Sequence, residues 1–84
     1  MIITFKSIPS IWWREFIGLK NNTIRQLKMG EDDIRFNLLD DFINQPFDLQ
    51  IEIMNSINFS CFIKQVTDVT FWEGWYIISW RDRK

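Results

Sequence analysis

Three side chains that can bind or activate a ligand occur close together, at Lys20, Thr23 and Arg25. Gly18 precedes them where a helical pattern ends, and glycine commonly ends a helix because, without a Cβ, it tolerates a positive φ. In an extended segment after that turn, Thr23 and Arg25 point to the same side, since strand side chains alternate. Lys20 can then reach over that side. This arrangement suits an anionic, carbonyl-bearing or base-like ligand.

The spacing also resembles a known signature. Gly18, Lys20, Thr23 and Arg25 reproduce the G-x-K-x-x-T-x-R pattern of the ASCH family, a PUA-like group of small barrel domains. Near the chain's end, the segments FIKQVTDVT (62–70) and GWYIISW (74–80) resemble the closing strands of the compact ASCH-type proteins often found in bacteriophages and prophages. The resemblance implies an α+β fold, a small PUA-like mixed β-barrel, and a role with RNA or its components.

Some small ASCH-type proteins are amidohydrolases that deacylate modified cytidines with a lysine, a threonine and a separate glutamate. The resemblance assigns the first two roles to Lys20 and Thr23. A partly desolvated lysine can accept a hydroxyl proton, and Arg25 can bind a developing oxyanion. The glutamate stays open, because the longer helical insertion of those enzymes is missing here. Glu73 lies in the equivalent turn, and Glu52 is the alternative.

A binding module is the first of three hypotheses, because it needs no third catalytic residue. Lys20 and Arg25 would hold a phosphate of RNA or of a nucleotide. Trp13 or Trp72 would stack on a base, a contact worth ~1–3 kcal/mol. Hydrolysis of an acylated nucleoside, with Lys20, Thr23 and Glu73 as the catalytic set, comes second.

The third hypothesis is a phage-type protein that binds and inhibits a host protein. Trp13 and Ile17 would provide an apolar anchor. An acidic face would mimic nucleic acid, formed by Glu31, Asp32, Asp33, Asp40 and Asp41.

Composition limits the remaining classes. A chain of 84 residues predicts one domain, 1–84, and eight Phe, five Trp and one Tyr supply an efficient core. The absence of histidine excludes Ser-His-Asp and Cys-His catalysis and argues against a zinc site, so we expect no metal or cofactor. The single Cys61 is expected to be a buried small hydrophobe. With no membrane-spanning apolar run, a cytoplasmic location is expected.

The patterning predicts seven elements. Residues 9–17 form a helix that begins at Pro9, with an apolar side made by Ile8, Ile11, Trp12, Phe16 and Leu19. A second helix covers 32–43, and strands cover 2–6, 22–27, 48–55, 59–71 and 75–80. The polar tail 81–84 is expected to be frayed. So hydrophobic a sheet favours a twisted or closed barrel.

Overall fold

The computed structural model describes residues 1–82. Its elements confirm the predicted order of five strands and two helices. In chain order they are β1 (Ile2–Ser7), α1 (Pro9–Phe16), β2 (Asn22–Arg25), α2 (Asp33–Asn44), β3 (Gln50–Asn55), β4 (Cys61–Trp72) and β5 (Trp75–Arg81). Arg81 therefore belongs to a strand, whereas Arg83 and Lys84, which were expected to be frayed, lie outside the described residues.

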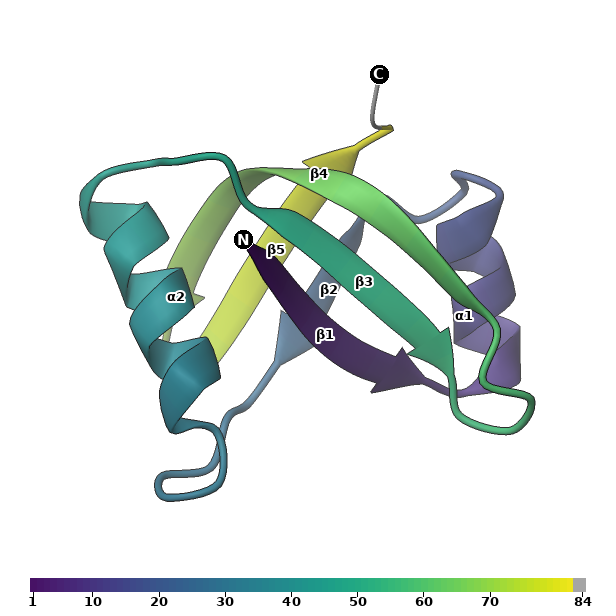
Figure 1. Ribbon diagram of the computed structural model, residues 1–84, viewed down its shortest axis with the longest axis horizontal. Helices are drawn as coiled ribbons and strands as arrows, with labels where there is room; N and C mark the ends of the chain where they lie inside the picture. Colours follow the sequence, from purple (N-terminus) through teal and green to yellow (C-terminus); the bar gives the residue numbers. More distant parts are fainter. Residues whose placement is uncertain (83–84) are drawn as a thin grey trace.

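The five strands form one mixed sheet in the order β1-β3-β4-β5-β2, and this sheet curls into a half-barrel (Figure 1). β1 pairs with β3 in parallel, and the other three pairings are antiparallel. β4 is the longest strand, and an irregularity between Val66 and Asp68 interrupts its pairing with β5. Such bulges bend a strand and increase its twist, which accounts for the curl. The predicted α+β class is confirmed.

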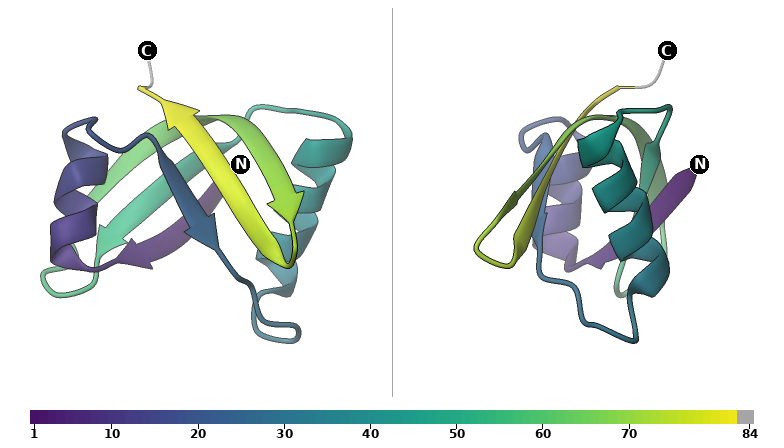
Figure 2. Two further views of the ribbon diagram at one scale, coloured as in Figure 1. Left: turned by 180° about the vertical axis from the view of Figure 1, so that it is seen from behind. Right: turned by 90° about the vertical axis from the view of Figure 1, so that its left-hand side faces the viewer.

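The two helices lie at opposite ends of the curled sheet, as Figures 1 and 2 both show. α2 buries Leu39 and Phe42, and α1 buries Trp12, whose Nε1 donates to the Ile53 carbonyl at 3.0 Å. The strands bury alternate residues along their inner face. Those apolar residues are Ile3, Phe5, Ile51, Ile53, Phe62, Val66, Val69, Tyr76, Ile78 and Trp80. Each helix therefore closes one end of a core made mainly by the sheet.

The prediction that Cys61 is buried is wrong, and the apolar side of α1 meets the core only in part. On α1 only Trp12 and Glu15 are buried, and most of the expected apolar side is exposed: Ile8, Ile11, Phe16 and Leu19. The helix lies at an end of the half-barrel, so only a narrow strip of its surface meets the core. Cys61 is exposed because it is the first residue of β4, beside the loop that leaves the sheet. Among residues 1–82, no helix is long and apolar enough to cross a membrane.

Candidate functional site

Lys20, Thr23 and Arg25 line one surface cleft, which we call the Lys20 cleft. Its volume is about 380 Å³, and it lies between the end of β1, the start of α1, and β2. Thr23 and Arg25 share a side of β2, as the alternation predicts, whereas Ile24 between them is exposed and borders the cleft from the edge of the strand. The cleft combines cationic, hydroxyl and apolar groups, from Lys6, Ser7, Ile8, Ile11, Lys20, Thr23, Ile24 and Arg25.

The turn after α1 places Lys20 at this cleft. Gly18 has a φ of +87°, the left-handed conformation predicted for it. The Lys20 N–H donates to the Arg14 carbonyl at 3.1 Å, and the Asn21 side-chain amide donates to the Gly18 carbonyl at 3.2 Å. Gly18 does not line the cleft, so its contribution is to direct the backbone that carries Lys20.

Arg25 joins the two free edges of the sheet. Its Nε donates to Thr23 Oγ1 at 2.9 Å, its Nη1 to the Lys6 carbonyl at 2.8 Å, and its Nη2 to Ser7 Oγ at 2.9 Å. Burial lowers the pKa of Arg25, an effect opposed by the nearby Glu15 carboxylate. Three of the five guanidinium N–H groups are thus directed to protein oxygens, which leaves fewer for a ligand.

Glu15 is the functional candidate that the sequence patterns missed. It lies in the last turn of α1 with an exposed fraction of 0%, and its Oε2 is 3.6 Å from Lys20 Nζ. Among residues 1–82, neither carboxylate oxygen accepts a hydrogen bond. A buried charge without hydrogen bonds normally costs several kcal/mol. One signal was available, because Glu15 follows Trp12 by three residues and therefore shares the buried side of the helix.

Lys20 is held between two acceptors. Its Nζ donates to the Asn22 carbonyl at 2.5 Å and lies beside Glu15. Its side chain is 32% exposed and lines the cleft, so it remains accessible to a ligand there. Lys20 and Arg25, which both line the cleft, also both interact electrostatically with the Glu15 carboxylate.

The other predicted site residues lie elsewhere. Trp13 is exposed on α1 and packs against Trp12 and Phe16, and Trp72 is exposed at the end of β4. Neither tryptophan is in the wall of the Lys20 cleft. Glu73 is exposed in the β4–β5 turn, with a φ of +48°.

Glu52, the alternative carboxylate, is half-buried on β3 and accepts a hydrogen bond from Thr4 Oγ1 at 3.1 Å. Of the carboxylates considered for the third catalytic role, neither Glu52 nor Glu73 lines the cleft. The carboxylate that the structure places beside Lys20 is Glu15, which is fully buried and does not line the cleft either.

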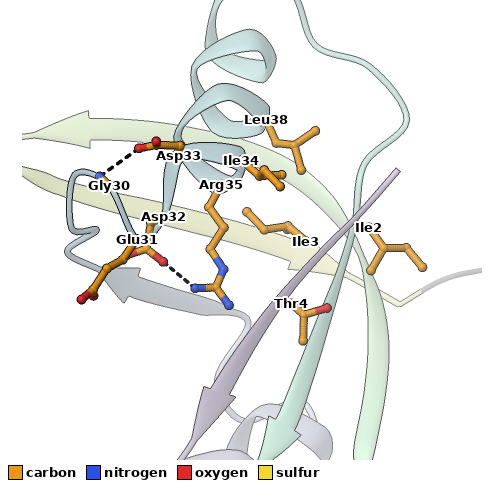
Figure 3. A pocket seen from close by; sticks show the side chains of 10 residues that line it. All are labelled: Ile2, Ile3, Thr4, Gly30, Glu31, Asp32, Asp33, Ile34, Arg35 and Leu38. Atoms are coloured by element: carbon orange, nitrogen blue, oxygen red, sulfur yellow. Dashed lines mark hydrogen bonds and ion pairs between the residues drawn. The ribbon is translucent and has the colours of Figure 1, made fainter.

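A second hollow, of about 490 Å³, lies between β1 and the start of α2 (Figure 3). Ile2, Ile34 and Leu38 give it apolar walls. Three of its charged side chains are engaged in contacts near the start of α2: Arg35 Nη1 is 2.6 Å from Asp32 Oδ1, and the Gly30 N–H donates to Asp33 Oδ1 at 3.0 Å. Tyr76 similarly donates to Asp40 Oδ1 at 2.5 Å. Asp32, Asp33 and Asp40 of the predicted acidic face are therefore engaged in hydrogen bonds within the protein.

The chain matches no protein-family model, no curated protein and no solved structure. What the Lys20 cleft can bind follows from its own residues.

Proposed function

We propose that this domain is a small ASCH-type binding module whose Lys20 cleft holds one nucleoside or nucleotide, free or within RNA. The observation that carries the proposal is the meeting of Lys20, Thr23 and Arg25 in one cleft of about 380 Å³. That volume is within the range of small-ligand pockets, which typically combine apolar walls with a few polar groups. A nucleobase offers flat apolar faces and a polar edge, which is the complementary pattern.

We expect the apolar residues of the cleft, and not Trp13 or Trp72, to contact the base. Ile8, Ile11 and Ile24 are exposed, and all three line the cleft. Aliphatic side chains can cover the face of a base by dispersion and burial. Lys6 and Lys20 supply mobile ammonium groups for a phosphate or a carbonyl at the same place.

The charge balance favours a single nucleotide over a long polyanion. The formal net charge is −1, and among the cleft's cations Arg25 is engaged in bridging β1 and β2. Polyanion binding usually depends on a broad basic surface. We therefore expect a weak salt dependence, with a slope of about −0.7 per phosphate neutralised.

Hydrolysis of an acylated nucleoside is the second candidate, favoured by Glu15 beside Lys20. Thr23 Oγ1 accepts a hydrogen bond from Arg25, so the hydroxyl proton remains available to a base. In this reaction Thr23 Oγ1 attacks the acyl carbon and its proton passes to Lys20 as the base. The proton is then delivered to the departing nitrogen as the C–N bond breaks. Water then hydrolyses the threonine ester to the free acid.

Binding ranks above hydrolysis because of how Lys20 is held. Its Nζ donates to the Asn22 carbonyl and faces the Glu15 carboxylate, so both neighbours are acceptors. A lysine that donates in this way is not placed to take the Thr23 proton. Inhibition of a host protein stays a prediction.

Titration of the protein with the four ribonucleosides and their 5′-monophosphates, followed by NMR shifts of backbone amides, tests the proposal. We expect shifts that map to residues around the Lys20 cleft. Lys20→Ala and Thr23→Val should each weaken binding about tenfold, as expected for the loss of one good polar contact. Lys28→Ala is the matched control, because it removes a cation from an exposed turn outside the cleft.

Shifts scattered over the surface, or equal affinities in Lys20→Ala and Lys28→Ala, would overturn the binding proposal. Release of free acid from N4-acetylcytidine by the wild type, abolished in Thr23→Val, would put hydrolysis first.

A further inference from the structure

Binding of a nucleoside beside Lys20 and Thr23 does not by itself account for Glu15. This carboxylate is completely buried, and among residues 1–82 both of its oxygens lack a hydrogen-bond donor. A buried polar group without a partner is rare and calls for an explanation. Replacing the charge with an apolar side chain would remove the desolvation cost, so the carboxylate needs a role that an apolar residue cannot perform.

A purely structural ion pair does not supply that role. Oε2 of Glu15 is 3.6 Å from Lys20 Nζ, which is beyond a charge-assisted hydrogen bond of about 2.7–2.9 Å. The Lys20 ammonium instead donates to the Asn22 carbonyl, at 2.5 Å. Glu15 thus interacts electrostatically with Lys20 and Arg25, but among residues 1–82 neither of its oxygens has a hydrogen-bond donor, so its acceptor capacity is unused.

We infer that Glu15 reads the polar edge of the ligand and that this ligand is a guanine base. The inference rests on the proposed nucleoside-binding function of the Lys20 cleft. One carboxylate presents two acceptors side by side, and the Lys20 ammonium presents a donor next to them. The Watson–Crick edge of guanine carries the matching series, the O6 acceptor followed by the N1–H and N2–H donors. Lys20 would donate to O6 while Glu15 accepts from N1–H and N2–H.

The other bases match less well. Cytosine offers one donor, N4–H, followed by two acceptors, so one Glu15 oxygen would stay unpaired. Uracil has a single donor between two acceptors, and adenine has one donor beside one acceptor. Only guanine satisfies both carboxylate oxygens and Lys20 together. A site built to hydrogen-bond a ligand discriminates strongly against analogues that leave its buried polar groups unpaired.

The path to Glu15 passes Lys20. Glu15 does not line the cleft itself; the cleft residue next to it is Lys20, whose side chain is 32% exposed and whose Nζ is 3.6 Å from Glu15 Oε2. When the ammonium turns toward the ligand O6, the buried carboxylate becomes open to the N–H groups of the base. Ile8, Ile11 and Ile24 then cover the faces of the ring from the cleft walls. In this proposal the Lys20 side chain rearranges and gives up its hydrogen bond to the Asn22 carbonyl.

Calorimetric titration with guanosine, inosine, adenosine, cytidine and uridine tests this inference in the intact protein. Inosine lacks only the 2-amino group, so it removes one of the two contacts to Glu15. We expect guanosine to bind about tenfold or more tightly than inosine, and more tightly than the other three. Glu15→Gln keeps the size of the side chain but converts one acceptor to a donor, so it should abolish the preference for guanosine. Glu31→Gln, on the exposed surface, is the matched control and should retain it.

The outcomes separate the two proposals. Binding of several nucleosides with equal affinities for guanosine and inosine overturns the reading by Glu15 and leaves nucleoside binding intact. A preference for cytidine that Glu15→Gln does not alter has the same meaning. Absence of binding by every nucleoside overturns both. If Glu15→Gln does not fold, the guanosine-to-inosine ratio of the wild type still decides the inference.

Discussion

Arg25 of β2 donates a hydrogen bond to Ser7 of β1 across the opening of the half-barrel, with 2.9 Å between Nη2 and Oγ. β1 and β2 are the two ends of the strand order and are not paired with each other. The same guanidinium also reaches the Lys6 carbonyl. One side chain of the candidate site therefore connects the edges of the sheet, and a ligand in the Lys20 cleft lies against this connection.

We expect Arg25→Lys to lower the free energy of unfolding by about 1–3 kcal/mol. The planar guanidinium donates to three protein oxygens at once, and the compact ammonium of lysine cannot reach all three. Urea denaturation gives this value. Arg35→Lys is a matched control, since both guanidinium carbons lie 4.9 Å from the Phe5 ring centre but the Arg35 side chain is 39% exposed and pairs with Asp32 at the start of its own helix. Its cost should be below about 1 kcal/mol. Equal stabilities of the two variants would show that the bridge contributes nothing.

Gly18→Ala tests whether the turn after α1 positions Lys20. The φ of +87° is unfavourable for a residue with a Cβ, and the loss of stability should be about 1–2 kcal/mol. Nothing lies within 4 Å of the added Cβ, so the cost comes from the backbone conformation alone.

Gly30→Ala is the control for this variant. Gly30 has a φ of +83° and equally open surroundings, but it lies in the turn before α2 and not in the turn that carries Lys20. Both variants should lose similar stability in urea, and only Gly18→Ala should weaken nucleoside binding. Equal nucleoside affinities of the two variants would show that the Gly18 turn does not position the site.

The raised pKa of Tyr76 predicts how the stability of the protein changes at high pH. Burial, and then the hydrogen bond to Asp40, raises the pKa of Tyr76 from 10.0 to about 12. Between these values the unfolded chain releases the phenol proton while the folded protein keeps it. Stability is therefore intact below pH 10 and falls as pH rises toward 12.

The chain contains one tyrosine, so phenolate absorbance reports this titration directly. Tyr76→Phe should remove this component of the pH dependence. A phenolate that forms at the ordinary pKa in the folded protein would contradict the burial of Tyr76.

Local rules predicted much of the cleft but not its buried carboxylate. Alternation along β2 put Thr23 and Arg25 on one side, and the Gly18 turn followed from the chemistry of a single residue. The i, i+3 spacing from Trp12 puts Glu15 on the same side of α1, but which side of α1 meets the sheet is set by long-range contacts that the spacing alone does not specify. For the same reason, the spacing does not report that the apolar side of α1 meets the core only in part.

The sequence likewise could not predict how far Trp72 and Glu73 lie from Lys20. Trp72 and Glu73 are at the β4–β5 hairpin, and β5 pairs with β2 so that Arg25 faces Tyr76 and Asn22 faces Ser79. The hairpin therefore lies beyond the Arg25 end of β2, whereas Lys20 precedes its Asn22 end. Pairing register, which the sequence did not specify, decides this separation.

Glu15→Met should stabilise the protein while damaging its site. It removes a buried charge that, among residues 1–82, has no hydrogen bond, and it leaves Lys20 with the Asn22 carbonyl and contact with solvent. Replacement of buried ionic groups by apolar ones of similar volume is often neutral or stabilising by about 1–4 kcal/mol. We expect a higher urea midpoint together with loss of guanosine preference. Glu31→Met, which changes the net charge equally at an exposed position, should alter neither. A lower midpoint for Glu15→Met would mean that the Glu15–Lys20 pair is a net source of stability, and it would remove the argument that this carboxylate is retained for a ligand.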